Sequence, residues 1–230
     1  MKQANQSHDS SAWLSRQTNG SVDKLHQDLL RMGTLVEEAL RKGLSALEMK
    51  DYVLADNVVA ADRNIDRMQR AVEEQCTRLI ADEQPTGVRL RELVTAIKIA
   101  STLERLGDHA RHLARRARSI TDSHYIQTLP IIREMAEIGI SMLHDFLTAW
   151  VEQNPDRAVA VAARDDQLDR LHAQLMREIM RIVQARPDTI ERGVDLLFVN
   201  RFLERLGDHV TNMCEWVVFV ERAEYVELNQ

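Results

Sequence analysis

An internal repeat constrains this chain more than any other feature of its sequence. The heptapeptide Leu-Glu-Arg-Leu-Gly-Asp-His occupies residues 103–109 and occurs again, unchanged, at residues 203–209. A second, weaker match precedes the heptapeptide in each half. Residues 62–66 correspond to residues 165–169, with an offset of 103 positions rather than 100. A connection between paired helices can absorb this three-residue difference. The sequence therefore predicts two copies of one structural unit, divided near residues 121–126.

Each copy has the spacing of apolar residues that is typical of packed helices. Leu103, Leu106, Ala110 and Leu113, for example, recur at steps of three or four. Prolines at positions 85, 155 and 187 interrupt the pattern. Six helical stretches are expected, near residues 21–49, 52–83, 87–120, 127–152, 156–185 and 188–223. The predicted fold is all-α, with two tandem pseudo-symmetric three-helix bundles.

The predicted domains follow from these stretches. Residues 1–20 are expected to form a flexible leader, residues 21–122 the first three-helix repeat, residues 126–223 the second, and residues 224–230 a tail. Only 8 glycines, 4 prolines and 4% aromatic residues occur in 230 residues, which argues against a sandwich or barrel.

Charge and cysteine content narrow the range of functions. The net charge of −6 gives no indication of a nucleic-acid partner. The N-terminus lacks the apolar core of a secretory signal, and no apolar run approaches the ~18 residues of a membrane span. Cys76 and Cys214 form neither a CxxC pair nor a disulfide framework, so each is expected to fill core space. A cytoplasmic location is the default expectation.

Two pairs of acids in each copy are the main candidate functional residues. The members of each pair lie four positions apart and therefore share a helix face at the edge of the core seam. The pairs are Asp62 with Asp66, Glu104 with Asp108, Asp165 with Asp169, and Glu204 with Asp208. Four converging carboxylates need compensating charge, which Fe, Mn, Zn, Mg or Ca ions could supply. Candidate additional ligands are His109, His112, His172 and His209.

Arginines offer an alternative that the residues alone leave open. A lattice of ion pairs between helices would satisfy the same carboxylates without metal, and arginines lie beside these acids at positions 63, 67, 105, 170 and 205. A separate basic stretch contains Arg111, Arg115, Arg116 and Arg118 and is interpreted as a solvated helix end that complements the helix dipole. A docking patch for an acidic partner or a membrane surface is the alternative for that stretch.

The chain carries no signature of an enzyme. It has no GxSxG, P-loop, HExxH or Gly-rich dinucleotide motif, and no matched pair of Glu-x-x-His motifs of the di-iron bundles. Gly107 and Gly207 lie inside predicted helices, where close helix–helix approach is the favoured explanation. A ferritin-like metal-binding or storage bundle is one alternative function, and a plain helical scaffold is another.

Two tandem three-helix repeats, each with Asp-x-x-x-Asp on one helix and Glu-Arg-Leu-Gly-Asp-His on the next, resemble the PhoU family. The resemblance covers about residues 21–223. It implies a cytosolic, often dimeric protein that negatively regulates phosphate uptake and phosphate-starvation (Pho regulon) signalling. The implied partners are the ATPase of the phosphate-specific ABC transporter and the phosphate-sensing histidine kinase. Membrane association would then occur only through these partners.

The resemblance also favours metal over ion pairs. Family members can bind multinuclear metal clusters at acid-x-x-x-Asp motifs, which would make ligands of Asp62, Asp66, Glu104, Asp108, Asp165, Asp169, Glu204 and Asp208. Fe, Zn, Mn and Mg are the candidate metals. The copies differ nearby, because Asn200 precedes Glu204 by four residues whereas Ala100 holds the equivalent place in the first copy. The two sites therefore need not share occupancy or nuclearity.

Overall fold

The computed structural model describes the backbone of residues 6–117 and 123–229, and the side chains from residue 22 onward apart from residues 118–124. Within these segments the chain forms α-helices, two short 3-10 helices and no strand, which confirms the predicted all-α class. The helices are α1 (Gln6–Met49), α2 (Tyr52–Glu83), α3 (Gly87–Arg116), η1 (Ser123–Thr128), α4 (Leu129–Val151), α5 (Pro155–Ala162), α6 (Asp165–Ala185), η2 (Pro187–Thr189) and α7 (Ile190–Arg222). No described helix combines the length and apolar character needed to cross a membrane.

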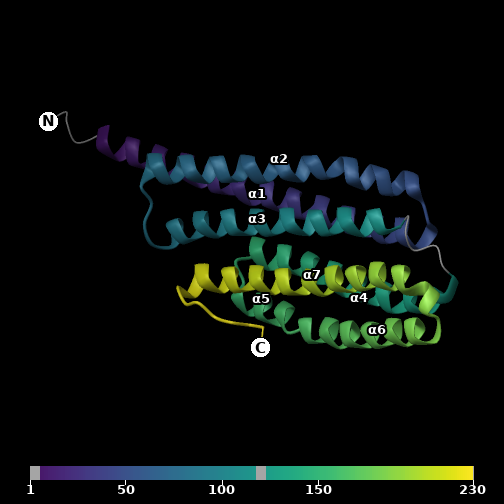
Figure 1. The fold of residues 1–230 in the computed structure, drawn as a ribbon. Coiled ribbons are helices and arrows are strands. Elements are labelled where there is room, and N and C mark those ends of the chain that lie inside the picture. The colour runs from purple at the N-terminus through teal and green to yellow at the C-terminus, as the bar shows by residue number, and fades with distance from the viewer. Residues whose placement is uncertain (1–5, 118–122, 230) are drawn as a thin grey trace.

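The helices form two bundles stacked along their long sides (Figure 1). Helices α1, α2 and α3 pack against one another in the first bundle, and α4, α5, α6 and α7 do so in the second. Two contacts join the bundles, because α1 packs on α4 and α3 packs on α7. One continuous core of buried apolar residues runs through both bundles, and it includes the free thiols of Cys76 and Cys214.

Local chemistry sets several helix ends. The side chain of Asp51 caps α2 by accepting a hydrogen bond from the backbone N–H of Leu54 at 2.9 Å. Asn154 caps α5 in the same way through the N–H of Arg157 at 3.0 Å. Gln84 ends α2 in the left-handed conformation, with φ of 47°, directly before Pro85. Each of these ends lies within two residues of a predicted boundary.

Two helix bounds differ from the sequence prediction. The fifth predicted stretch, 156–185, is broken into α5 and α6 at Ala163 and Arg164. Both residues keep near-helical backbone angles (φ −59°, ψ −12° and φ −80°, ψ −13°). Neither is a glycine or a proline, so the sequence at this point gives no sign of a helix break. Helix α1 begins at Gln6 rather than at residue 21, so its backbone includes part of the predicted leader. The predicted end of the third helix at residue 120 lies outside the described residues.

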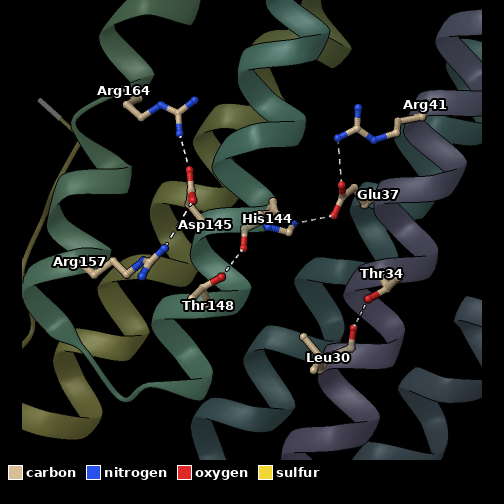
Figure 2. Close-up of polar contacts among 9 residues, drawn as sticks. All are labelled: Leu30, Thr34, Glu37, Arg41, His144, Asp145, Thr148, Arg157 and Arg164. Atoms are coloured by element: carbon tan, nitrogen blue, oxygen red, sulfur yellow. Dashed lines mark hydrogen bonds and ion pairs between the residues drawn. The ribbon is translucent and has the colours of Figure 1, made fainter.

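Charged side chains hold α4 to its neighbours (Figure 2). Glu37 on α1 lies 3.4 Å from Nδ1 of His144 on α4, which ties the two bundles together. Asp145 on α4 pairs with Arg157 at 3.7 Å and with Arg164 at 2.8 Å. Because Arg157 lies on α5 and Arg164 at the start of α6, Asp145 fixes the break between these helices against α4.

Polar side chains link α3 to α7 at both ends of the contact between these helices. Near the start of α3, the guanidinium of Arg91 donates two hydrogen bonds, of 3.1 and 3.0 Å, to the carbonyl of Val220. At its other end, Arg116 forms an ion pair with Asp195. The two copies of the repeated heptapeptide lie between these links, one on each helix.

Candidate metal centres

We call Asp62, Asp66, Glu104 and Asp108 the first acidic cluster. Asp62 on α2 is buried, with 6% of its side chain exposed, and the other three acids are partly buried. Arg111 on α3 donates to Asp62 at 3.0 Å and to Asp108 at 2.5 Å. The guanidinium thus bridges α2 and α3 and supplies positive charge inside the first acidic cluster.

The pKa values of this cluster reflect its convergence. Burial raises the pKa of Glu104, and the charges of Asp108, Asp66 and Asp62 raise it further. Burial also raises the pKa of Asp62, but the charge of Arg111 opposes that effect. All four predicted acids of the first repeat therefore act on one another across the α2–α3 contact.

We call Asp165, Asp169, Glu204 and Asp208 the second acidic cluster. Asp165, in the first turn of α6, is only 3% exposed, and neither of its carboxylate oxygens forms a hydrogen bond within the described residues, although the side-chain amide of Asn229 lies near enough to lower its pKa. Glu204 accepts from Arg201 at 2.5 Å through Oε1, whereas its buried Oε2 has no partner among the described residues. Asp169 is exposed. The second acidic cluster thus contains buried oxygens that make no hydrogen bond in the part of the chain that the structure describes.

The chain's tail reaches this second cluster. The side-chain amide of Asn229 donates to Asp208 at 3.2 Å. Burial raises the pKa of Asp165 to about 6, Asn229 opposes the shift, and Asp208, Asp169 and Glu204 add to it. The pKa of Glu204 is raised by burial and by Asp208 and Asp169. The four acids of the second repeat therefore also converge, between α6 and α7.

Two further side chains that could act as metal ligands border the second acidic cluster. The side-chain amide of Asn200 donates to the backbone carbonyl of His172 at 3.0 Å, while Asn200 Oδ1 and His172 Nδ1 are buried and have no hydrogen-bond partner among the described residues. The charge of His172 lowers the pKa of Glu204, which places the imidazole within electrostatic reach of the carboxylate. Orphaned carboxylate, amide and imidazole donors fit a hard or borderline cation.

The two clusters fit a metal unequally. In the described part of the chain, no three His, Cys, Asp or Glu side chains are arranged to hold a metal ion as they stand. At the second acidic cluster the unsatisfied oxygens could turn toward one. At the first acidic cluster Arg111 already binds Asp62 and Asp108, so a cation there would have to displace the guanidinium.

The arginine that pairs with the cluster acids is not one of those expected from the sequence. None of the arginines at positions 63, 67, 105, 170 and 205 forms an ion pair with a described cluster acid. Arg67 instead donates to Asn64 and to the carbonyl of Arg63. Arg111, which the sequence placed at a solvated helix end, is the arginine that enters the first acidic cluster. Its position three residues after Asp108, on the same helix face, was the available signal.

Gly107 and Gly207 lie where helices approach closely, in agreement with the packing explanation. A Cβ atom on Gly107 would lie 3.0 Å from Ile65 Cδ1 of α2. One on Gly207 would overlap Asp165 Oδ1 and lie 2.6 Å from Leu168 Cδ1 of α6. The glycines thus allow the second helix of each pair to carry its acids up against the first.

Three of the four candidate histidine ligands lie elsewhere, at the α3–α7 contact. The rings of His109 and His209 stack with centroids 5.4 Å apart, and His112 stacks on Phe202 at 5.2 Å. Burial lowers the pKa of both His109 and His209 to about 4, so both imidazoles are neutral at pH 7. His172 borders the second acidic cluster, and the charges of Asp108 and Asp208 also reach His112 and His209.

Comparison with known proteins places the two repeats in one family. The PhoU domain matches residues 29–117 and matches again at residues 132–217. The chain belongs to the PhoU family. This PhoU-family chain is 35% identical over 209 residues to a protein of Clostridium acetobutylicum named phosphate-specific transport system accessory protein PhoU homolog, a match that covers 90% of this chain and 95% of that protein. It is 30% identical to the Escherichia coli (strain K12) accessory protein PhoU, over 92% of this chain and 88% of that one.

Solved PhoU structures have the same fold. The crystal structure of the phosphate transport system regulatory protein PhoU from Streptococcus pneumoniae matches with a TM-score of 0.85 and 30% identity, over 91% of this chain and 99% of that one. PhoU from Pseudomonas aeruginosa matches with a TM-score of 0.85 and 31% identity, over 90% and 99% of the two chains. The PhoU family consists of regulatory accessory proteins and not of enzymes. This confirms the expectation from the sequence that the chain is not an enzyme.

Proposed function

We propose that this chain is an accessory regulator of phosphate transport that keeps the phosphate-starvation response low when phosphate is plentiful. The observation that carries the proposal is the PhoU match over both repeats, together with relatives named for phosphate-specific transport. The chain would act in the cytoplasm, as a homodimer. It would link the ATPase subunit of the phosphate-specific ABC transporter to the phosphate-sensing histidine kinase.

A relay of this kind needs a body that binds one state of a partner better than another. The shared core and the links between α3 and α7 support such a body, because they resist movement of one bundle against the other. A partner that binds one repeat and a partner that binds the other would then be held at a fixed separation. The state of the transporter could in this way decide access to the kinase.

Deletion of the gene in its own bacterium tests the regulatory role. A phosphate-starvation reporter is expected to be high in phosphate-rich medium in the deletion strain and low again when the intact chain is restored. An unchanged reporter would overturn the proposal. A tagged chain should also recover the transporter ATPase and the kinase at one or more phosphate levels, and recovery of neither would contradict the adaptor role.

We further infer that the second acidic cluster is the principal metal centre. Asp165 and Glu204 would hold the ion, with Asp208, Asp169, His172 and Asn200 available to complete its surroundings. The support is that neither carboxylate oxygen of Asp165, a side chain that is 3% exposed, forms a hydrogen bond within the described residues. A bound Fe, Zn, Mn or Mg ion, or a multinuclear cluster of them, would supply positive charge that draws α6 and α7 together.

Elemental analysis tests this assignment. Protein purified from cells and dialysed against a mild chelator is reloaded with each metal in turn, and the bound metal per chain is measured. The double variant Asp165→Asn/Glu204→Gln should lose the metal, whereas the matched variant Asp62→Asn/Glu104→Gln in the first acidic cluster should retain most of it. Equal retention in both variants would contradict the assignment. The reporter experiment does not depend on this result.

A further inference from the structure

The two copies of the heptapeptide meet at an open hollow of about 220 Å³ between α3 and α7, on the contact that joins the repeats. We call it the central hollow. It contains two pairs of repeat-equivalent residues, Arg105 with Arg205 and His109 with His209. Because the same heptapeptide supplies each pair, the pseudo-symmetry of the chain brings two guanidinium groups and two imidazoles to one place.

Arg105 of the central hollow acts on the charge of Glu104 but forms no ion pair with it. Neither Arg105 nor Arg205 forms a hydrogen bond or an ion pair in the described part of the chain. The acid that lines the hollow is Asp108, and its carboxylate is bound by Arg111 at 2.5 Å. Both guanidinium charges act on the rings at the centre, since each lowers the pKa of His109 and of His209. Two converging positive charges of this kind favour an anion between them.

The remaining walls limit what that anion can be. His109 Nδ1 is buried and has no hydrogen-bond partner within residues 22–117 and 125–229, and Phe202 lines the hollow with its ring 5.5 Å from that of His109. The volume is below the roughly 300–1,000 Å³ of most cofactor pockets, which favours a small ion. Arginine pairs suit tetrahedral oxyanions, because each planar guanidinium can donate two parallel hydrogen bonds to two oxygens.

We propose that the central hollow binds a phosphate-type tetrahedral oxyanion, held by Arg105 and Arg205 from the two repeats. The site differs from the two acidic clusters in its chemistry, because its lining is mostly guanidinium and imidazole groups and its one lining carboxylate, Asp108, is bound by Arg111. It goes beyond the regulatory role proposed above, because it assigns a small-molecule ligand to the junction of the repeats. An ion held there would connect α3 to α7 and so couple the two bundles.

Calorimetric titration of the full, chelator-treated chain with inorganic phosphate tests the proposal. One phosphate per chain is expected to bind. Arg105→Ala and Arg205→Ala should each weaken binding by roughly 10-fold or more, as loss of a charge-assisted hydrogen bond implies. The matched control is Arg177→Ala, which removes an exposed arginine of α6 that has no ion pair in the described part of the chain and lies outside the hollow. It should leave the affinity unchanged.

Thermal melts of each variant establish that it is folded, and Arg105→Lys, which keeps the charge but not the planar donor pair, provides a second variant at the same position. No binding of phosphate at millimolar concentration, or equal binding by both arginine variants and wild type, would overturn the proposal. So would a loss as large in Arg177→Ala as in the hollow variants. Phosphate binds in chelator-treated protein if the site is right, even where the metal assignment is wrong.

A nucleoside monophosphate forms the second arm of the titration. Tighter binding of adenosine monophosphate than of inorganic phosphate, with the difference removed by Phe202→Leu, would identify a nucleotide as the source of the phosphoryl group. Equal or weaker binding would identify the free ion. Either result supports the oxyanion site only if both arginine variants reduce it.

Discussion

The two acidic clusters contain the same four acids in the same helical positions, yet they are neutralised differently. In the first acidic cluster Arg111 binds both Asp62 and Asp108. Thr211 holds the equivalent position on α7, and its buried hydroxyl makes no hydrogen bond to any described residue. The same is true of the carboxylate oxygens of Asp165 by hydrogen-bond geometry. An identical motif therefore does not make an identical site, because a residue just beyond the motif decides whether its charge is already compensated.

Other departures reinforce this difference. Asn200 of the second repeat corresponds to Ala100 of the first, and His172 corresponds to Gln69 by the offset of the first helix of each pair. The second repeat thus has an amide where the first has a methyl group, and an imidazole where the first has the amide of Gln69. One repeat has become self-neutralised, whereas the other keeps the donors that a cation requires.

Exchanging the residues at these two positions should have the largest effect. Thr211→Arg is expected to place a guanidinium among the second-cluster acids and to remove its bound metal entirely. Arg111→Thr should instead open the first acidic cluster and add metal there. The measurement is metal per chain by elemental analysis after reloading, with Thr211→Val as the uncharged control of similar size. Unchanged metal content in both exchanges would mean that the arginine does not decide occupancy.

Stability should separate the clusters next. Arg111→Ala leaves the buried carboxylate of Asp62 without its partner, and an uncompensated buried charge costs about 3–5 kcal/mol. Because Arg111 is 27% exposed, a loss of about 2 kcal/mol in the free energy of unfolding is expected. Thr211→Ala should change the free energy by less than about 0.5 kcal/mol, since its hydroxyl makes no hydrogen bond.

Urea denaturation of chelator-treated protein measures both values. Arg105→Ala is the control on the same helix, because it removes an arginine that forms no ion pair in the described part of the chain. Equal losses for Arg111→Ala and Arg105→Ala would show that the ion pairs to Asp62 and Asp108 do not stabilise the α2–α3 contact.

The fold was within reach of the sequence because its signals are local or repeated. Apolar spacing and prolines located the helices, and the duplicated heptapeptide predicted the tandem bundles. The break between α5 and α6 was missed, since Ala163 and Arg164 keep near-helical angles and the contact that fixes it comes from Asp145 on another helix. A tertiary ion pair of this kind leaves no mark on the local sequence.

The candidate site was predicted in part for the same reason. A step of four residues predicted that the acids of each cluster share helix faces, and the four acids of each cluster act on one another electrostatically, whereas their role as metal ligands stays a prediction. The helix periodicity alone did not reveal which cation would reach them, because Arg111 approaches Asp62 from a neighbouring helix. The contact of Asn229 with Asp208 was also missed, since it joins the tail to α7 across 21 residues of sequence.

The glycines offer a smaller test of the same asymmetry. Gly207→Ala would force a methyl group against Asp165 and Leu168, and overpacking costs about 1–3 kcal/mol. The gain in helix propensity returns about 1 kcal/mol, so a net loss of about 1 kcal/mol is expected. Gly107→Ala meets Ile65 at 3.0 Å and should be close to neutral. Urea denaturation of both variants measures the two losses in the free energy of unfolding. A larger loss for Gly107→Ala than for Gly207→Ala would contradict the tighter packing inferred at Gly207.

The smallest effect concerns the pH dependence of the second acidic cluster. Burial raises the pKa of Asp165 to about 6 from an ordinary value of 3.8, so the folded state takes up a proton before the unfolded state does. The charged carboxylate therefore destabilises the metal-free fold above pH 6, and that penalty is relieved as the pH falls toward 4. Asp165→Asn should stabilise the metal-free protein at pH 7.5, and its advantage over wild type should shrink by about 1 kcal/mol at pH 5.

The comparison with wild type is essential, because His109 and His209 act in the opposite direction. Their pKa values of about 4 lie below the ordinary 6.5. Both imidazoles therefore destabilise the fold as the pH falls from 6.5 toward 4. The difference between Asp165→Asn and wild type cancels this contribution. Asp62→Asn should stabilise the protein less at pH 7.5 than Asp165→Asn does, because Arg111 opposes the rise in the pKa of Asp62 and loses its partner in that variant. An equal gain from the two substitutions would show that the clusters are electrostatically alike, and Arg111 could not then be what distinguishes them.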